Sequence, residues 1–186
     1  RQRLWNIRAK QVVLATGSVP DPPAIPGIDG AIVRTVGEVL ENASPRGGVP
    51  SVVIGGGATG CEVALHLAES GCPVTIVEKL MRIGARIESV TRKLILERLE
   101  EYGVGMMTGA EVLAIQDDGV LVQNRGPGEH FVDAGQVVVV TGMRPENGLH
   151  ERIREMEIPV YQVGDCLEPR SAKAAIYEGA VIGRTI

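Results

Sequence analysis

The apolar and polar residues along the chain form short β-branched runs that alternate with longer segments of helical spacing. Four short apolar runs predict buried strands at 51–54, 73–78, 104–108 and 136–140. Two longer segments predict helices at 59–70 and 88–102, followed by the stop signals Gly71 and Gly103. Strand and helix therefore alternate over residues 51–108, which predicts parallel strands joined by right-handed crossovers.

Outside this region the predicted elements are shorter. Short alternating segments predict an antiparallel meander at 111–116, 120–123 and 130–133. Residues 117–119 form its hairpin turn. A strand is expected at 11–15, an extended proline-rich segment at 19–27, a strand at 160–163 and a helix from Ser171. The expected fold class is α/β, a Rossmann-like parallel sheet with helices and a small antiparallel meander on one face.

A second break rich in Pro and Gly, at 44–50, predicts a domain boundary. We expect three segments, at 1–44, 45–143 and 144–186, of which the middle one folds independently and the flanks are held less firmly. The chain enters a strand without a starting Met, and its last helix ends without a Gly or Asn cap. We therefore expect it to be part of a longer protein.

Composition excludes several classes of partner. Only 3% of the residues are aromatic, with Trp5 and Phe131 the single examples of their types, which leaves little for stacking on nucleic-acid bases. The net charge is −4, and no basic run is long enough to follow a phosphate backbone. We expect a small-molecule or protein partner and no nucleic acid.

The cysteines and histidines predict neither a metal site nor a redox dithiol. The chain has an odd number of cysteines, Cys61, Cys72 and Cys166, and they form no CxxC motif. This pattern fits free thiols in a reducing cytoplasm. Cys61 is interpreted as a packing residue, with a lowered thiol pKa as the alternative. The three histidines, at 66, 130 and 150, lack ligand spacing. Neither a signal peptide nor an apolar run of membrane-spanning length is found, so we expect a cytoplasmic protein.

The strongest chemical signal is Gly55-x-Gly57-x-x-Gly60, which follows one predicted strand and opens a predicted helix. Gly55 makes a tight turn, Gly57 lets the backbone approach a pyrophosphate, and Gly60 lets the helix pack closely on the strand. Residues 55–60, which also include Gly56, Ala58 and Thr59, are therefore predicted to bind a dinucleotide at the helix N-terminus. The alternative is a glycine-rich turn that binds no nucleotide.

An acid ends the second strand of this unit. Glu78 lies where a carboxylate accepts hydrogen bonds from the ribose hydroxyls, and it would repel a 2′-phosphate, so NADH is favoured over NADPH. Lys79 is also assigned to the cofactor site. Together with Arg82 and Arg86 it weakens this preference, because these cations could bind a phosphate. NADPH therefore stays open.

A second candidate lies after the strand at 160–163. Gly164 and Asp165 connect this strand to the helix at Ser171, and a carboxylate there could bind a sugar hydroxyl. The alternative, favoured by the residues alone, is a turn aspartate or a helix N-cap.

The order of these motifs resembles the FAD- and NAD(P)-dependent pyridine nucleotide-disulfide oxidoreductases. The motifs are 13–17 with 25–27, 55–60, 140–145 and 163–165. Gly164-Asp165-Cys166 with 174–179 is most similar to the C-terminal half of old-yellow-enzyme-like reductases, of the 2-enoate reductase, 2,4-dienoyl-CoA reductase and trimethylamine dehydrogenase type. The resemblance covers nearly the whole chain.

The resemblance implies that 45–143 is an NAD(H)-binding domain inserted into an FAD-binding domain. Pieces of the FAD-binding domain would then lie at 1–44 and 144–186. It also implies specific roles for residues outside the glycine fingerprint. Asp165, with Gly164, would bind the ribityl chain of FAD, and Thr16 and Gly17 would lie on the flavin side of the junction. Glu62 would face the nicotinamide, with a solvated helix residue as the alternative, and Gly142 would close the nicotinamide pocket.

One departure from the family pattern limits what the chain can do alone. The family has an earlier glycine fingerprint that binds the FAD pyrophosphate, and this chain starts after that position. We therefore expect FAD binding only in the intact protein, and an isolated chain without activity. The expected function is hydride transfer from NAD(P)H to FAD and onward to an electron-accepting domain or protein. The alternatives are a structural module that binds ADP or a dinucleotide, and a disulfide reductase whose CxxC lies elsewhere.

Overall fold

A computed structural model describes residues 9–41, 47–126, 128–140, 142–155 and 158–186. The chain divides into two compact units, one formed by Arg1–Asp21 with Gly142–Ile186 and the other by Pro22–Thr141. Part of the predicted break at 44–50 and Thr141 of the 140–145 motif lie outside the described residues.

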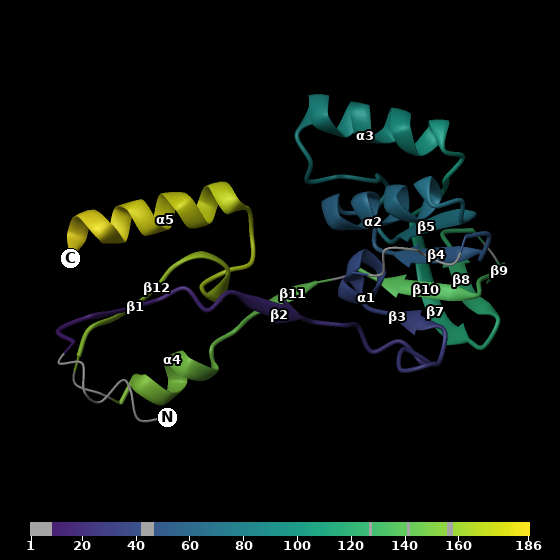
Figure 1. The fold of residues 1–186 in the computed structure, drawn as a ribbon. Coiled ribbons are helices and arrows are strands. Elements are labelled where there is room, and N and C mark those ends of the chain that lie inside the picture. The colour runs from purple at the N-terminus through teal and green to yellow at the C-terminus, as the bar shows by residue number, and fades with distance from the viewer. Residues whose placement is uncertain (1–8, 42–46, 127, 141, 156–157) are drawn as a thin grey trace. The chain divides into compact units, whose positions relative to one another are not determined.

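The middle unit is built on a five-stranded parallel sheet (Figure 1). Its order is β3 (Val33–Arg34), β10 (Gln136–Val139), β4 (Ser51–Ile54), β5 (Val74–Glu78) and β6 (Gly105–Thr108). All four neighbouring pairs are parallel, and the strand–helix alternation over 51–108 predicted two of them, β4 with β5 and β5 with β6. The central strand β4 is buried along its whole length, because helices cover one face of the sheet and the meander covers the other.

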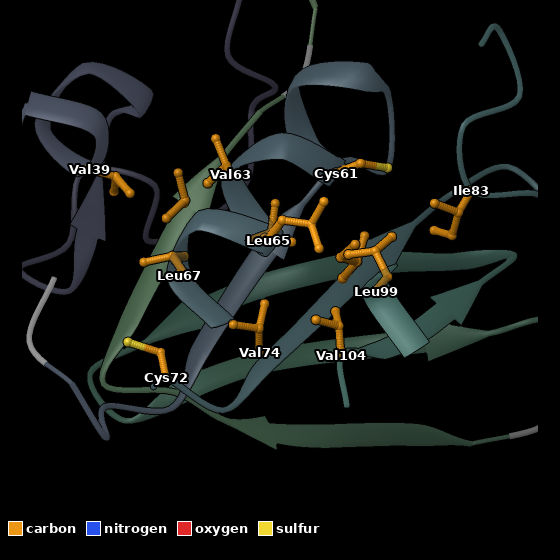
Figure 2. Close-up of a cluster of buried hydrophobic side chains, with 14 residues drawn as sticks. Val39, Cys61, Val63, Leu65, Leu67, Cys72, Val74, Ile83, Leu99 and Val104 are labelled. Atoms are coloured by element: carbon orange, nitrogen blue, oxygen red, sulfur yellow. The ribbon is translucent and has the colours of Figure 1, made fainter. Parts of the chain in front are cut away.

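Helices cover one face of this sheet. They are α1 (Val36–Glu41), α2 (Ala58–Glu69) and α3 (Ser89–Glu101), of which α2 and α3 were predicted. Figure 2 shows side chains of α2, among them Val63 and Leu67, converging with Leu99 and Val74 between the helices and the sheet. Val63, Leu67 and Leu99 are fully buried. Each such side chain contributes about 1.5–3 kcal/mol of hydrophobic free energy.

The predicted meander covers the opposite face. Its strands are β7 (Ala110–Gln116), β8 (Gly119–Asn124) and β9 (Glu129–Asp133), paired antiparallel. Val120 and Val122 pack with Val52 and Val137 of the sheet in a second buried cluster. The expected turn at 117–119 is shorter by one residue, because Gly119 already belongs to β8, where a Cβ would lie 2.3 Å from the Val132 carbonyl oxygen.

Residues ahead of the predicted boundary at residue 45 also pack in the compact unit that contains the sheet. The Ile115 N–H donates to the Pro26 carbonyl at 2.8 Å, and a Cβ on Gly27 would lie 1.9 Å from the Ile115 carbonyl oxygen. The proline-rich segment therefore lies against the meander, and β3 extends the sheet beside β10. The assignment of cofactors to these segments stays a proposal.

The second unit contains two pairs of short strands. β1 (Val12–Leu14) pairs parallel with β12 (Val160–Gln162), and β2 (Ser18–Pro20) pairs antiparallel with β11 (Met143–Pro145). Its other elements are α4 (Gly148–Ile153), the 3₁₀ turn η1 (Gly164–Cys166) and α5 (Ala172–Thr185). The predicted strands at 11–15 and 160–163 and the helix from Ser171 are confirmed, and Ser171 caps α5 by accepting from the Ala174 N–H. Across the described ranges, no helix is long and apolar enough to cross a membrane.

Candidate functional site

The turn between β4 and α2 has a backbone that requires glycine at its first position. Gly55 directly follows β4 with φ +110°, a conformation that side-chain-bearing L residues rarely adopt, and its N–H donates to the Val77 carbonyl at 2.9 Å. The chain therefore reverses tightly at the carboxyl end of the sheet, and α2 begins three residues later.

Two further glycines of the turn face very different surroundings. A Cβ on Gly60 would lie 1.9 Å from the Gly55 carbonyl oxygen, so only glycine lets the first turn of α2 approach the strand this closely. A Cβ on Gly57 would meet nothing within 4 Å, and Gly57, Ala58 and Thr59 are all exposed. The free N–H groups and positive dipole end of the twelve-residue α2 thus face open space.

Glu78 lies beside this turn although 22 residues separate it from Gly56. One carboxylate oxygen accepts from the Gly56 N–H at 2.6 Å, and the other accepts from the Leu80 N–H at 2.7 Å. The side chain is half-buried at the end of β5. The carboxylate therefore fixes the glycine turn, and each of its oxygens keeps further capacity to accept a hydrogen bond.

The loop that follows Glu78 is hydrogen-bonded to the same glycine, Gly56. The Gly84 N–H donates to the Gly56 carbonyl at 2.7 Å, and Arg92 of α3 donates from Nε to the Ile83 carbonyl at 2.6 Å. The backbone N–H and the backbone carbonyl of Gly56 are therefore both hydrogen-bonded. Sequence reasoning missed Arg92, because no local pattern connects a helix residue with a loop nine positions earlier.

The cations beside Glu78 have different surroundings. Lys79 Nζ lies 2.7 Å from Glu111 Oε1, which belongs to β7. Arg82 and Arg86 are exposed and make no side-chain hydrogen bond or ion pair within the described part of the chain. Sequence reasoning did not single out Glu111, because the two partners are 32 residues apart and belong to different layers.

Two residues on the first turns of α2 have contrasting positions. Glu62 is exposed, whereas Cys61 is fully buried. Burial, followed by the nearby charges of Glu62 and Glu78, raises the pKa of the Cys61 thiol to about 11. The interpretation of Cys61 as a packing residue is confirmed, and its thiol stays protonated at neutral pH.

The remaining candidates lie in the other unit. The Thr16 hydroxyl donates to the Glu146 carbonyl at 2.8 Å, and the Gly17 carbonyl accepts from the Glu146 N–H at 3.0 Å. Gly142, at φ +36°, offers its carbonyl to the Asp21 N–H at 3.1 Å. These three contacts join the strands β2 and β11 at their ends.

Asp165 lies half-buried in η1 and accepts two hydrogen bonds, from the Ser18 hydroxyl at 3.3 Å and from the Arg170 N–H at 3.2 Å. It is not the N-cap of α5, because Ser171 takes that position. The preceding Gly164 has φ +70°, and its N–H donates to Glu178 at 2.7 Å. Glu178 in turn is paired with the Arg170 guanidinium, so the turn that carries Asp165 is held by α5.

A groove of about 500 Å³ lies away from these residues. It is lined by the amino ends of the parallel strands, among them Ser51, Val74 and Gly105, together with Phe131 of β9. Ligands of open parallel sheets bind at the carboxyl ends of the strands, where Gly55 and Glu78 lie. We therefore place the candidate site at the glycine turn.

Known proteins share this fold and motif order. The family model described as pyridine nucleotide-disulphide oxidoreductase matches residues 3–179. A metal reductase of Desulforamulus reducens is 30% identical over 90% of this chain and 29% of its own length. An NADH oxidase of Thermoanaerobacter brockii is 35% identical over 83% of this chain and 24% of its own length.

A solved structure of 2-naphthoyl-CoA reductase superposes with a TM-score of 0.86 at 31% identity, covering 95% of this chain and 27% of that one. The chain therefore spans about a quarter of the length of the relatives it matches. These matches confirm the α/β fold and the family resemblance predicted from the order of the motifs.

Proposed function

Because the chain belongs to the pyridine nucleotide-disulphide oxidoreductase family, we propose that its middle unit binds NADH for hydride transfer to FAD within a longer flavoprotein. The observation that carries the proposal is the joined geometry of Gly56, Gly57 and Glu78. A carboxylate, a glycine with open space and a helix N-terminus meet at one edge of the sheet. Open space at Gly57 is what a pyrophosphate needs to approach the backbone.

The residues of the turn would divide the binding between them. The exposed N–H groups at the start of α2 would donate to the pyrophosphate, which the helix dipole also favours. Glu78 would accept hydrogen bonds from the ribose hydroxyls with its remaining lone pairs. NADH would supply the hydride and the flavin would accept it, while the protein supplies position and electrostatics.

The flavin end of the proposal concerns the other unit. Asp165 would bind the ribityl hydroxyls of FAD, in a turn fixed by Ser18, Arg170 and Glu178. Thr16 and Gly17 would lie near the flavin, Gly142 would close the nicotinamide pocket, and the exposed Glu62 would face the nicotinamide. The electron acceptor would be a further domain or protein.

A structural nucleotide module is the second candidate. The residues proposed for the adenosine half all lie within Pro22–Thr141. They would bind ADP without any contribution from a nicotinamide pocket. Both candidates use the same glycines and Glu78.

Calorimetric titration of the chain with NADH and ADP-ribose tests the proposal and separates the candidates. We expect Glu78→Ala to weaken NADH binding about tenfold or more, because the ribose hydroxyls lose a charged hydrogen-bond acceptor. Glu97→Ala, which removes an exposed carboxylate from α3, is the matched control and should bind as the wild type does. Unfolding curves of both variants show whether the turn itself is intact.

Binding of NADH that Glu78→Ala does not weaken would contradict the role of Glu78. Equal affinity for ADP-ribose and NADH would favour the structural module, since the nicotinamide would then contribute nothing.

A further inference from the structure

The Lys79–Glu111 ion pair places an acid of the meander against a cation next to the proposed ribose acceptor. Lys79 directly follows Glu78, and its Nζ lies 2.7 Å from Glu111 Oε1. Glu111 itself belongs to β7, outside the strand–turn–helix motif. Glu111, which belongs to the meander, therefore partly offsets the positive charge that Lys79 would present to a bound nucleotide.

The backbone segments that carry these two side chains are joined by a hydrogen bond. The Gly109 N–H donates to the Leu80 carbonyl at 2.9 Å, which ties the start of the meander to the loop one residue after Lys79. Ala110 of β7 is buried in the second cluster, so Glu111 follows a residue that is packed against the sheet. The side chains of Lys79 and Glu111 are 73% and 56% exposed, so the pair can open and is sensitive to salt.

A 2′-phosphate on the ribose needs a nearby cation to offset Glu78. Lys79 is adjacent in sequence to Glu78, and its ammonium is paired with Glu111. We propose that Glu111 is a specificity-determining residue of the dinucleotide site, which favours NADH over NADPH by holding the Lys79 ammonium away from a 2′-phosphate. This inference rests on the proposed function and deepens it.

The test compares dissociation constants of NADH and NADPH for the full chain and its variants at one ionic strength. Glu111→Gln should tighten NADPH binding relative to NADH about three- to fivefold, the largest change that one exposed ion pair supports. The gain should fall at high salt, because the freed charge is screened. Adding Lys79→Gln to Glu111→Gln should return the ratio to its wild-type value.

Glu97→Gln is the matched control, because it removes the same charge from another exposed Lys–Glu pair, on α3. If its NADPH-to-NADH ratio moves as far as that of Glu111→Gln, net charge explains the effect and the inference is overturned. A gain that survives Lys79→Gln also overturns it and assigns the phosphate to Arg82 or Arg86. If the wild-type chain binds neither nucleotide, the proposed function fails as well, whereas NADH binding with an unchanged ratio overturns only the role of Glu111.

Discussion

Single residues of the turn have separate geometric functions, and the structure gives a physical reason for each. Gly55 has a positive φ that favours glycine, and Gly60 has no Cβ to clash with the Gly55 carbonyl. Gly57 leaves open space at the start of α2. The spacing of the fingerprint was enough to predict these three positions. It was not enough to predict Glu111 or Arg92, whose partners are distant in sequence or belong to irregular loops.

Gly60 is a sensitive position for stability. Gly60→Ala should lower the free energy of unfolding by about 2 kcal/mol or more, because the new Cβ would lie 1.9 Å from a backbone oxygen and would displace α2. Gly57→Ser is the control on the same turn and should be as stable as the wild type or slightly more, since Ser is a good N-cap. Urea unfolding curves of the three proteins make the comparison, and equal midpoints for Gly60→Ala and the wild type would contradict the packing argument.

Among the elements, those that build the candidate site were predictable and several others were not. The runs at 51–54 and 73–78 are apolar and bounded by turn residues, and the helix between them is long enough for its periodicity to appear in sequence. The missed elements have two to six residues, contain no uninterrupted apolar run and are stabilised by their neighbours: β3, β11, α1 and α4.

The start of α3 gives a prediction about pH. Glu88 accepts from the Val90 and Thr91 N–H groups, and these backbone hydrogen bonds lower the pKa of its carboxyl below the ordinary value of 4.5. A lowered folded-state pKa means that the cap contributes its full stability above the ordinary pKa and loses it as the pH falls through the lowered value.

Glu88→Gln should therefore destabilise the protein most near neutral pH, and its difference from the wild type should shrink below pH 4.5. Unfolding measured by urea at a series of pH values tests this. Glu97→Gln, which lies outside the first turn of the same helix, is the control. A Glu88→Gln difference that stays constant down to the acid limit would show that the charge of the cap is not used.

For the whole molecule, the residues proposed for the two cofactors are divided between the two compact units. The glycine turn, Glu78 and the Lys79–Glu111 pair all lie within Pro22–Thr141, while Thr16, Gly142 and Asp165 lie in the other unit. The sequence break suggested a boundary near residue 45, because proline-rich segments are typical of linkers. It could not show that Pro26 is hydrogen-bonded to the meander and that Gly27 packs against it, since these contacts join residues about ninety positions apart. We therefore take dinucleotide binding by the middle unit as the central claim.

Titration of NADH into the wild-type chain, Gly57→Ser and Gly57→Asp tests this claim most directly. Aspartate is a favoured N-cap and a Cβ at Gly57 meets nothing within 4 Å, so Gly57→Asp should unfold at the same urea concentration as the wild type or higher. Its carboxylate would nevertheless occupy the space proposed for the pyrophosphate and repel its negative charge, so NADH binding should weaken on the order of tenfold or more. The NADH affinity of Gly57→Ser should lie between those of the wild type and Gly57→Asp. If Gly57→Asp is folded and binds NADH as tightly as the wild type, no pyrophosphate lies at this turn and the proposed function is wrong.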